Sequence, residues 1–564
     1  MQQLQTVKDF SIYAAAQFLR TAVFIDDRIY NQKTMAVEPE KIPKTSRKRA
    51  TKGANDENNE LLLVSPEETN ENKDFPSQQL VNSFAKKQIV CSLYQPGKRE
   101  SFSNNSDVYE LCLASDIVII DWDLGGNPGD KALELISCLV HQSVETKPEQ
   151  LRLILVYTSE INLGAIASEV FDKLSELRKE NIKPQKEDEG LSMHSSNSRV
   201  VILGKPGYRI EKYKFHEVTE KELAQKSIEE FSKLASGLLQ GAILLGLAKI
   251  RENSRKILSK FGESIDTAFL LHRAMSMPHE EAFEHIHPLL VAEIQSILQD
   301  CLSGQIISDS LVSDWALRKW KPNPEALNWL PPQTTANKFI ENLCLLGPNG
   351  LEMSKNPLKL AKKNKNDTWE WVIDKDKLNK LSSLMFQSDN KSSNHKLAIL
   401  MSHRTSYGNI EKSLTLTLGT IIRKGTTKNP QYLLCLLPIC DTVRLSEKRR
   451  FLFCVLDVMN EGTLPIQKAN YIIEDEKVFR ELLYTPKSYN CITLEFEPDS
   501  ETKTVIAKIH KNNNLNFICK TDKENYKWIA QLKPEHAQRA SEQFASDLSR
   551  VGLTESEWLR LRSK

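Results

Sequence analysis

The chain has 564 residues, which is too many for one hydrophobic core, so we expect two to four domains. Its 76 basic and 74 acidic side chains leave a formal net charge of +2, which excludes nucleic-acid binding driven by overall charge. The ten cysteines form no CxxC pair and several lie in apolar runs, a pattern that favours reduced, buried thiols over disulfides or a zinc site. The N-terminus mixes charged with apolar residues and lacks a small-residue cleavage site, so we expect no signal peptide and a cytoplasmic location.

The first 210 residues alternate apolar runs of strand length with segments of helical spacing. Helices are predicted at 8–20, 76–87, 107–114, 129–142 and 161–180. Strands are predicted at 20–26, 88–94, 116–124, 151–160 and 198–207. The alternation predicts an α/β domain around a parallel five-stranded sheet, whose strands are almost wholly apolar because helices cover both faces. Charge, Asn, Ser and Pro dominate between about 32 and 75, which predicts a disordered insertion.

A long helix is predicted after residue 210, beginning at a capping box of Thr219 and Glu222 and ending near Gly262. Its apolar run 234–248 would reach only ~22 Å, short of a ~30 Å hydrocarbon core, so we predict a buried helix and no membrane span. Further helices are predicted at 264–277, 279–301 and 308–320.

The C-terminal part changes character again. Apolar runs between 413 and 530 predict a small antiparallel barrel or sandwich, followed by a helix at 534–551. We therefore expect an α/β domain at 1–215, a helical segment at 216–325, a mixed α/β linker region at 326–412 and a β-rich domain with C-terminal helices at 413–564.

Polar side chains stand at the ends of four of the five predicted strands, where an open parallel sheet forms its sites. The carboxyl ends supply Asp26 and Asp27, Asp121 and Asp123, Thr158, and Lys205. Clustered carboxylates repel one another, and a hard divalent cation such as Mg²⁺ would offset that repulsion.

This combination of side chains suits phosphoryl transfer to a carboxylate. Asp121 would attack phosphorus and form an acyl phosphate, while the metal and Lys205 neutralise the phosphoryl oxygens. Thr158 would hydrogen-bond the new phosphoryl group, and its displacement would report the modification to the surface.

Residues 20 to 210 resemble the receiver domain of two-component response regulators, on the stretches "VFIDD", "DIVIIDWDL", "LVYT" and "GKP". The resemblance implies a flavodoxin-like, doubly wound sheet and phosphorylation of Asp121 by a partner sensor histidine kinase. It implies that Asp26, Asp27, Asp121 and the backbone carbonyl of Asp123 serve Mg²⁺. By the same resemblance Thr158 is the switch hydroxyl and Lys205 is the phosphate partner.

The chain departs from the receiver pattern at three positions beyond the insertion. Gly125 stands where the family usually has proline, and Ile202 stands where a switch aromatic is expected, so the signal is expected to leave by another route. The carboxylate of Asp123 lies beside the phosphoryl site and is expected to alter the lifetime of the phosphoryl group.

Two alternative readings remain open from the sequence. A haloacid-dehalogenase-like phosphatase would use Asp121 and Asp123, although the late acidic pair of that family is absent after Lys205. A degenerate receiver serving as a protein-binding scaffold would use none of the chemistry. In the favoured reading the catalysis is limited to self-phosphorylation and autodephosphorylation.

Residues 211–564 match no output module, so neither a transcription factor nor specific nucleic-acid binding is expected. Large atypical receivers resemble components of bacterial conflict systems such as the Detocs-like phage-defence two-component systems, in which a receiver acts as phosphate sink or adaptor beside an effector. Gly237, Gly241 and Gly246 would let another helix approach, which fits internal packing and a homodimer seam equally well. We interpret His272 as an ordinary, partly buried histidine.

Overall fold

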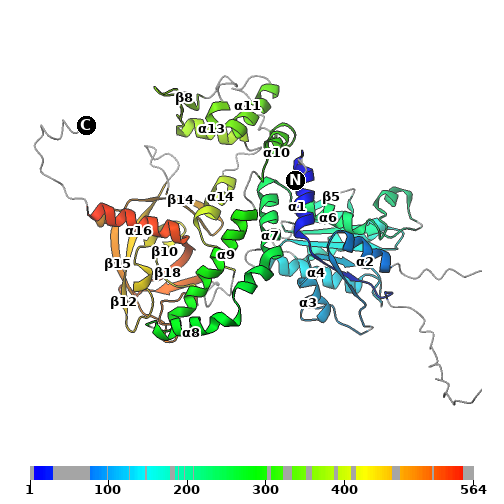
Figure 1. Ribbon diagram of the computed structural model, residues 1–564, viewed down its shortest axis with the longest axis horizontal. Helices are drawn as coiled ribbons and strands as arrows, with labels where there is room; N and C mark the ends of the chain where they lie inside the picture. Colours follow the sequence, from blue (N-terminus) through cyan, green and yellow to red (C-terminus); the bar gives the residue numbers. More distant parts are fainter. Residues whose placement is uncertain are drawn as a thin grey trace, which may run out of the picture. The chain divides into compact units, whose positions relative to one another are not determined.

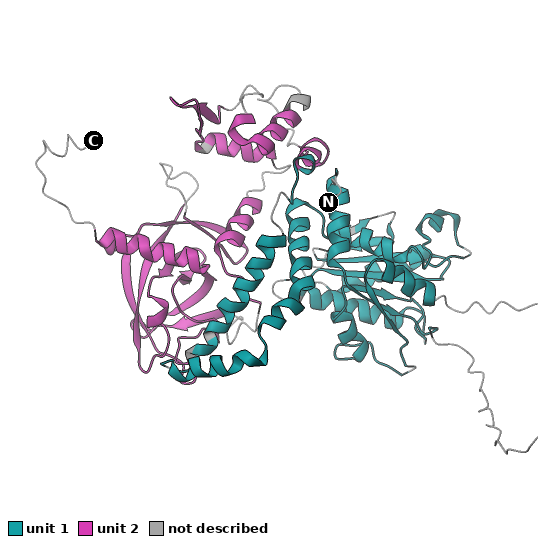
Figure 2. Ribbon diagram, in the orientation of Figure 1, with its two compact units in different colours: residues 1–311 teal, residues 312–564 magenta. Residues whose placement is uncertain are grey.

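The computed structural model describes residues 5–29, 77–97, 99–125, 127–145, 149–177, 185–187, 190–195, 197–207, 209–277, 279–301, 306–321, 333–350, 359–385, 392–407, 414–459, 470–510 and 514–549. The chain divides into two compact units, Met1–Leu311 and Val312–Lys564 (Figure 2). The insertion predicted at 32–75 lies outside the described residues. In the ranges given above, no helix combines the length and the apolar character that crossing a bilayer requires.

Unit 1 is built on a seven-stranded sheet in the order β2-β1-β3-β4-β7-β6-β5. Figure 1 shows helices packed around this sheet. The five parallel strands are β1 (Thr21–Ile25), β2 (Val90–Tyr94), β3 (Ile117–Ile120), β4 (Arg152–Thr158) and β7 (Ser198–Gly204). Counted along the chain, these five lie in the order 2-1-3-4-5, which is the flavodoxin-like doubly wound order. The parallel core is therefore as predicted.

The predicted count of five strands is wrong, because an antiparallel hairpin extends the sheet beside β7. Its strands are β5 (Gln185–Glu187) and β6 (Ser192–His194). Each is only three residues long, and Met193 in β6 is the one apolar residue of the two strands, so neither gives the apolar run by which the other strands were predicted.

Helices cover both faces of this sheet, since successive side chains of a strand point to opposite faces. In β1, Val23 and Ile25 join one core while Ala22 and Phe24 join the other. The first core is completed by α3 (Asp107–Leu113), α4 (Asp130–Glu145) and α5 (Leu163–Glu176). The second is completed by α1 (Val7–Phe18), α2 (Ser77–Lys86) and α6 (Leu223–Leu234).

The long helix predicted from Thr219 to Gly262 is two helices. α6 ends at Leu234, and α7 (Leu238–Lys260) begins after Gly237, whose φ of +132° lies outside the helical region. The apolar run at 234–248 is buried on one face only, because Leu239 and Ile243 are exposed. Gly241 accounts for part of the packing: a Cβ there would stand 2.5 Å from a ring carbon of Phe10 in α1.

The rest of unit 1 is helical. After α7 come η3 (Glu263–Ile265), α8 (Asp266–Met275), η4 (His279–His285) and α9 (Ile286–Cys301), and α10 (Asp309–Asp314) meets the boundary with unit 2. The helices predicted in this region are present, with a turn or a 3₁₀ segment at their starts.

Unit 2 begins with a small helical cluster around Trp320, Phe339 and Ile340. Its elements are η5 (Trp315–Lys319), α11 (Gln333–Leu346), η7 (Gly347–Asn349), β8 (Ala361–Lys363), β9 (Trp369–Trp371), α13 (Lys375–Met385) and α14 (Ser392–Ser402).

The remainder of unit 2 is an antiparallel nine-stranded sheet (Figure 1). Its elements are β10 (Thr420–Thr426), β11 (Asn429–Cys435), η8 (Ile439–Asp441), β12 (Arg449–Val458), β13 (Tyr471–Asp475), β14 (Val478–Tyr484), η9 (Ser488–Asn490), β15 (Cys491–Phe496), β16 (Lys508–His510), β17 (Asn514–Ile518) and β18 (Asn525–Gln531). A bridge between Phe496 and Cys519 joins β15 to the end of β17, so strands 10, 11, 12, 15, 17 and 18 form a closed circuit around an aromatic core. The helix α16 (Pro534–Leu548) packs on the outer face.

Candidate functional site at the carboxyl edge of the parallel sheet

Four parallel strands end at one edge of the sheet and deliver polar side chains there. Asp26 follows β1, Asp121 follows β3, Thr158 ends β4 and Lys205 follows β7. The register keeps these ends level, since Ile25 pairs with Ile120 and Thr158 pairs with Gly204. The edge includes the gap between β1 and β3, where the strand order reverses and where open α/β sheets bind their ligands.

Three carboxylates gather at this edge. One oxygen from each of Asp26, Asp27 and Asp121 lies within 4.8 Å of the others. Asp26 and Asp121 are fully buried and Asp27 is half-buried, so little water screens their mutual repulsion. Carboxylate oxygens in this number are the donors that a hard divalent cation prefers, so the residues present fit Mg²⁺.

Two cationic side chains share the cluster. The Nζ of Lys205 lies 2.7 Å from Asp26 Oδ2 and 3.2 Å from Asp121 Oδ1. The guanidinium of Arg28 donates a hydrogen bond of 2.7 Å to Asp121 Oδ2, and its Nε lies 3.7 Å from Asp26. Lys205 is nearly buried, whereas the Arg28 side chain is 46% exposed. The two oxygens of Asp121 therefore face different cations, one held inside and one at the surface.

The electrostatics of the cluster oppose full ionisation. Burial raises the pKa of Asp121 to about 6, against the attraction of Lys205. Burial, and then the charge of Asp26, raise the pKa of Asp27. Burial alone would lower the pKa of Arg28, but the Asp121 carboxylate, together with Asp26 and Asp27, outweighs it, so the pKa of Arg28 rises. Raised carboxyl pKa values are the expected state of a cation site before its cation binds.

Thr158 and Asp123 lie at the same edge but in different surroundings. The buried Thr158 hydroxyl oxygen accepts a hydrogen bond of 3.1 Å from the backbone N–H of Glu160. The Asp123 side chain is exposed, and its Oδ1 accepts a bond of 3.3 Å from the N–H of Gly125. Gly125 has a φ of +77°, so proline would fit neither that dihedral nor that hydrogen bond.

Sequence reasoning missed Arg28 and Arg209 at this edge. Arg28 directly follows the acidic pair, and that position was the only available signal. Arg209 comes four residues after Lys205, and nothing local marks it. Its guanidinium is buried and donates to the Lys205 carbonyl at 2.6 Å.

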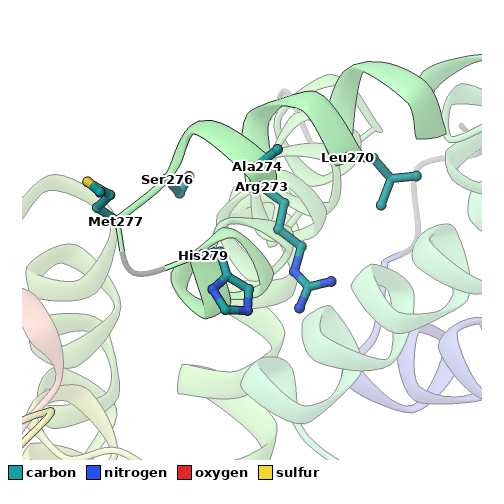
Figure 3. Close-up of a pocket in the computed structure, with 6 residues that line it drawn as sticks. All are labelled: Leu270, Arg273, Ala274, Ser276, Met277 and His279. Atoms are coloured by element: carbon teal, nitrogen blue, oxygen red, sulfur yellow. The ribbon is translucent and has the colours of Figure 1, made fainter.

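A separate surface pocket lies on α8 and the turn that follows it, away in sequence from the aspartates (Figure 3). Its lining is Leu270, Arg273, Ala274, Ser276, Met277 and His279. Beside it, His272 Nε2 and His285 Nδ1 lie 2.8 Å apart, and both residues are exposed. The interpretation of His272 as partly buried is therefore wrong, because the residue itself is exposed.

Comparison with known proteins agrees with the fold of the parallel sheet. Residues 18–209 match the family model described as "Response receiver domain". The chain therefore carries a receiver domain over about a third of its length, which agrees with the doubly wound sheet. No curated protein and no solved structure matches the chain.

Proposed function

We propose that this protein accepts a phosphoryl group from a partner sensor histidine kinase on Asp121 and acts as a response regulator, phosphate sink or adaptor. One observation carries the proposal: a buried carboxylate stands at the end of β3 between Lys205, Arg28 and two further acids, in a domain of the receiver family. The same match favours a receiver over a haloacid-dehalogenase-like phosphatase.

The proposed step is an in-line displacement at phosphorus. A carboxylate oxygen of Asp121 forms a bond to phosphorus, while the bond from phosphorus to the imidazole nitrogen of the kinase phosphohistidine breaks. The imidazole keeps the bonding electron pair and takes up a proton from solvent. The product is an acyl phosphate on Asp121 and a free histidine.

The hydrogen bonds of Asp121 distinguish its two oxygens. Oδ1 accepts from the N–H of Trp122 at 3.0 Å and lies near the buried Lys205, so it is held inside. Oδ2 faces the half-exposed Arg28, whose guanidinium donates to it at 2.7 Å. We infer that Oδ2 attacks, once Arg28 has swung away from it.

Other side chains at the edge would stabilise the product. Lys205 would move its contact from Asp121 to a phosphoryl oxygen, and the Thr158 hydroxyl would donate to another. Asp26, Asp27 and Asp121, with the backbone carbonyl of Asp123, would hold Mg²⁺, which when bound neutralises charge on the phosphoryl oxygens.

Labelling with acetyl phosphate tests the proposal. Wild-type protein with Mg²⁺ is expected to take up a hydroxylamine-sensitive, acid-labile phosphoryl group, and the Asp121→Asn variant is expected to take up none. Asp130→Asn, an exposed acid at the start of α4, is the matched control and should label like wild type. Equal labelling of Asp121→Asn would overturn the proposal. Turnover of a generic phosphomonoester would favour the phosphatase instead.

Replacing Arg28 with glutamine is expected to change the labelling rate by no more than about fivefold, because a half-exposed ion pair contributes at most about 1 kcal/mol. The measurement is the initial rate of acetyl phosphate labelling at neutral pH. A loss of several orders of magnitude would show that Arg28 belongs to the machinery that Oδ2 needs.

Replacing Asp123 with asparagine is expected to change the decay rate of the phosphoryl group, because the variant removes an exposed negative charge beside the site. That charge also raises the pKa of Asp27, so its loss makes Asp27 easier to ionise. The measurement is the half-life of labelled protein after acetyl phosphate has been removed. Equal half-lives for variant and wild type contradict the expectation.

We further propose that the protein is cytoplasmic and that the regions at 216–325, 326–412 and 413–564 carry the output, with an effector protein or a second copy of the chain as partner. A role in antiphage defence, in a Detocs-like system, is the biological setting that we propose. The direct test is phosphotransfer to this protein from a histidine kinase encoded beside it. If no neighbouring kinase phosphorylates the protein, the proposed role in a Detocs-like system is contradicted.

A further inference from the structure

Arg209 joins the two loops that carry Thr158 and Lys205. Its Nη2 donates to the carbonyl of Lys205 at 2.6 Å and to that of Thr158 at 3.4 Å, and its Nη1 donates to the carbonyl of Glu160. Its Nε lies 3.2 Å from a carboxylate oxygen of Glu217. The guanidinium thus bonds three backbone carbonyls at the site and one carboxylate beyond it.

The chain makes room for this guanidinium at Gly204. A Cβ on Gly204 would stand 2.4 to 2.6 Å from the Cζ, Nε and Nη2 atoms of Arg209, closer than real side chains approach. Glycine at this position lets the guanidinium lie directly against the end of β7. Because the guanidinium bonds the backbone of both loops, it should move when either loop moves.

A continuous path of hydrogen bonds runs through Arg209. The Thr158 hydroxyl accepts from the N–H of Glu160, the carbonyl of Glu160 accepts from Arg209, and Arg209 reaches Glu217. If Thr158 rotates about its Cα–Cβ bond so that Oγ1 moves toward a phosphoryl group, the bond from Glu160 is lost. The carbonyl of Glu160 then moves, and Arg209 must follow it or release it.

The far end of the path is the segment η2 (Glu211–His216), which packs on the start of α5. A Cβ on Gly164 would lie 2.0 Å from the Tyr213 hydroxyl oxygen, so Tyr213 touches that helix start closely. Val218 donates its N–H to the carbonyl of Gly204 at 2.9 Å. Phe215, in the same segment, is 96% exposed. A shift at Glu217 would therefore reach a surface that carries the solvent-exposed ring of Phe215.

We propose that Arg209 couples phosphorylation of Asp121 to the conformation of η2, in place of the switch aromatic that this chain lacks. The proposal rests on the proposed function of Asp121. Ile202, at the position of that aromatic, is fully buried and has no polar group, so it cannot follow Thr158 by a hydrogen bond. Arg209 is a positioning residue in this scheme, since it acts through Thr158, Lys205 and Glu217.

Amide hydrogen exchange in the presence and absence of beryllofluoride and Mg²⁺ tests the coupling, because beryllofluoride adds to a carboxylate oxygen as a phosphoryl group does. In wild type, exchange at residues 210–218 is expected to change by at least about fivefold, as a coupling of about 1 kcal/mol requires. In Arg209→Gln the exchange at these residues is expected to change by less than about twofold on adding beryllofluoride. Fluorine NMR should still show beryllofluoride bound to Asp121 in this variant.

Two further variants keep the test decisive. Glu217→Gln leaves the three carbonyl bonds of Arg209 and weakens only the outgoing link, so it should lose the η2 response even if Arg209→Gln does not fold. Glu211→Gln, an exposed acid of the same segment, is the control and should respond like wild type.

The outcomes separate the two proposals. If beryllofluoride does not bind wild-type protein, the proposed function fails. If it binds and η2 does not respond in wild type, or responds equally in Arg209→Gln and Glu217→Gln, the coupling role of Arg209 is overturned while the function of Asp121 stands.

Discussion

The Asp121→Asn variant is expected to be more stable than wild type at neutral pH without metal, by about 3 kcal/mol, although it removes the proposed phosphoacceptor. The pKa of Asp121 is raised from 3.8 to about 6 by burial, so the folded protein holds this proton more tightly than the unfolded chain does. A raised carboxyl pKa gives a stabilisation that is fully present below pH 3.8 and is lost as the pH rises through about 6. Asparagine does not ionise, so the variant escapes that loss.

The measurement is the free energy of unfolding of both proteins across this pH range. Because unit 1 and unit 2 need not unfold together, unfolding should be followed by hydrogen exchange in peptides from β1, β3 and β4. The difference between variant and wild type should be small near pH 4 and should grow until about pH 6. A difference that stays constant with pH contradicts the expectation.

Adding Mg²⁺ should narrow the difference in stability between the two proteins. A ligand at a hundredfold excess over its dissociation constant stabilises the state that binds it by about 2.7 kcal/mol. Wild type offers three carboxylates and the variant only two, so the cation should stabilise wild type more. Equal shifts for both proteins would mean that Asp121 is not among the residues that hold the cation.

The sequence predicted the acidic edge because strand ends are a local property. The four residues of β3 are all apolar and buried, so the run ends where Asp121 begins, and the parallel order then brings the other strand ends beside it. The pairing of the Arg28 guanidinium with Asp121 Oδ2 was not predictable in this way. Arg28 and Asp121 are 93 positions apart, and only the folded loop after β1 brings the guanidinium to the carboxylate.

The features that sequence reasoning missed all depend on contacts or dihedral angles that exist only in the folded chain. The β5–β6 hairpin has short, mostly polar strands that join the sheet because β6 pairs with β7, and pairing leaves no periodic pattern. The break between α6 and α7 depends on the backbone dihedral of Gly237, whereas a glycine within an apolar run also fits a continuous helix. Arg209 is buried because Gly204 lacks a side chain, a relation that only the packed structure reveals.

Replacing Lys205 with methionine is expected to slow the phosphorylation of Asp121 by about two to three orders of magnitude, the usual effect of removing one preorganised group that stabilises developing charge. Lys205 Nζ lies within 3.2 Å of both Asp26 and Asp121 and is nearly buried, so water cannot replace it. Methionine has a similar length and no charge. Its loss of attraction should also raise the pKa of Asp121 further, because Lys205 is the strongest influence that lowers it.

Arg28→Gln is the matched control, because it removes the other cation on the same carboxylate. Arg28 is half exposed, so solvent takes over much of its role and the rate should change by at most about fivefold. The measurement is the labelling rate of both variants as a function of pH. The labelling rate of Lys205→Met should reach a lower plateau, and the midpoint of its pH dependence should lie at higher pH than in wild type. Loss of a merely structural contact would instead lower the amount of folded protein without moving that midpoint. Equal rates for the two variants would mean that burial does not decide which cation stabilises the transferred group.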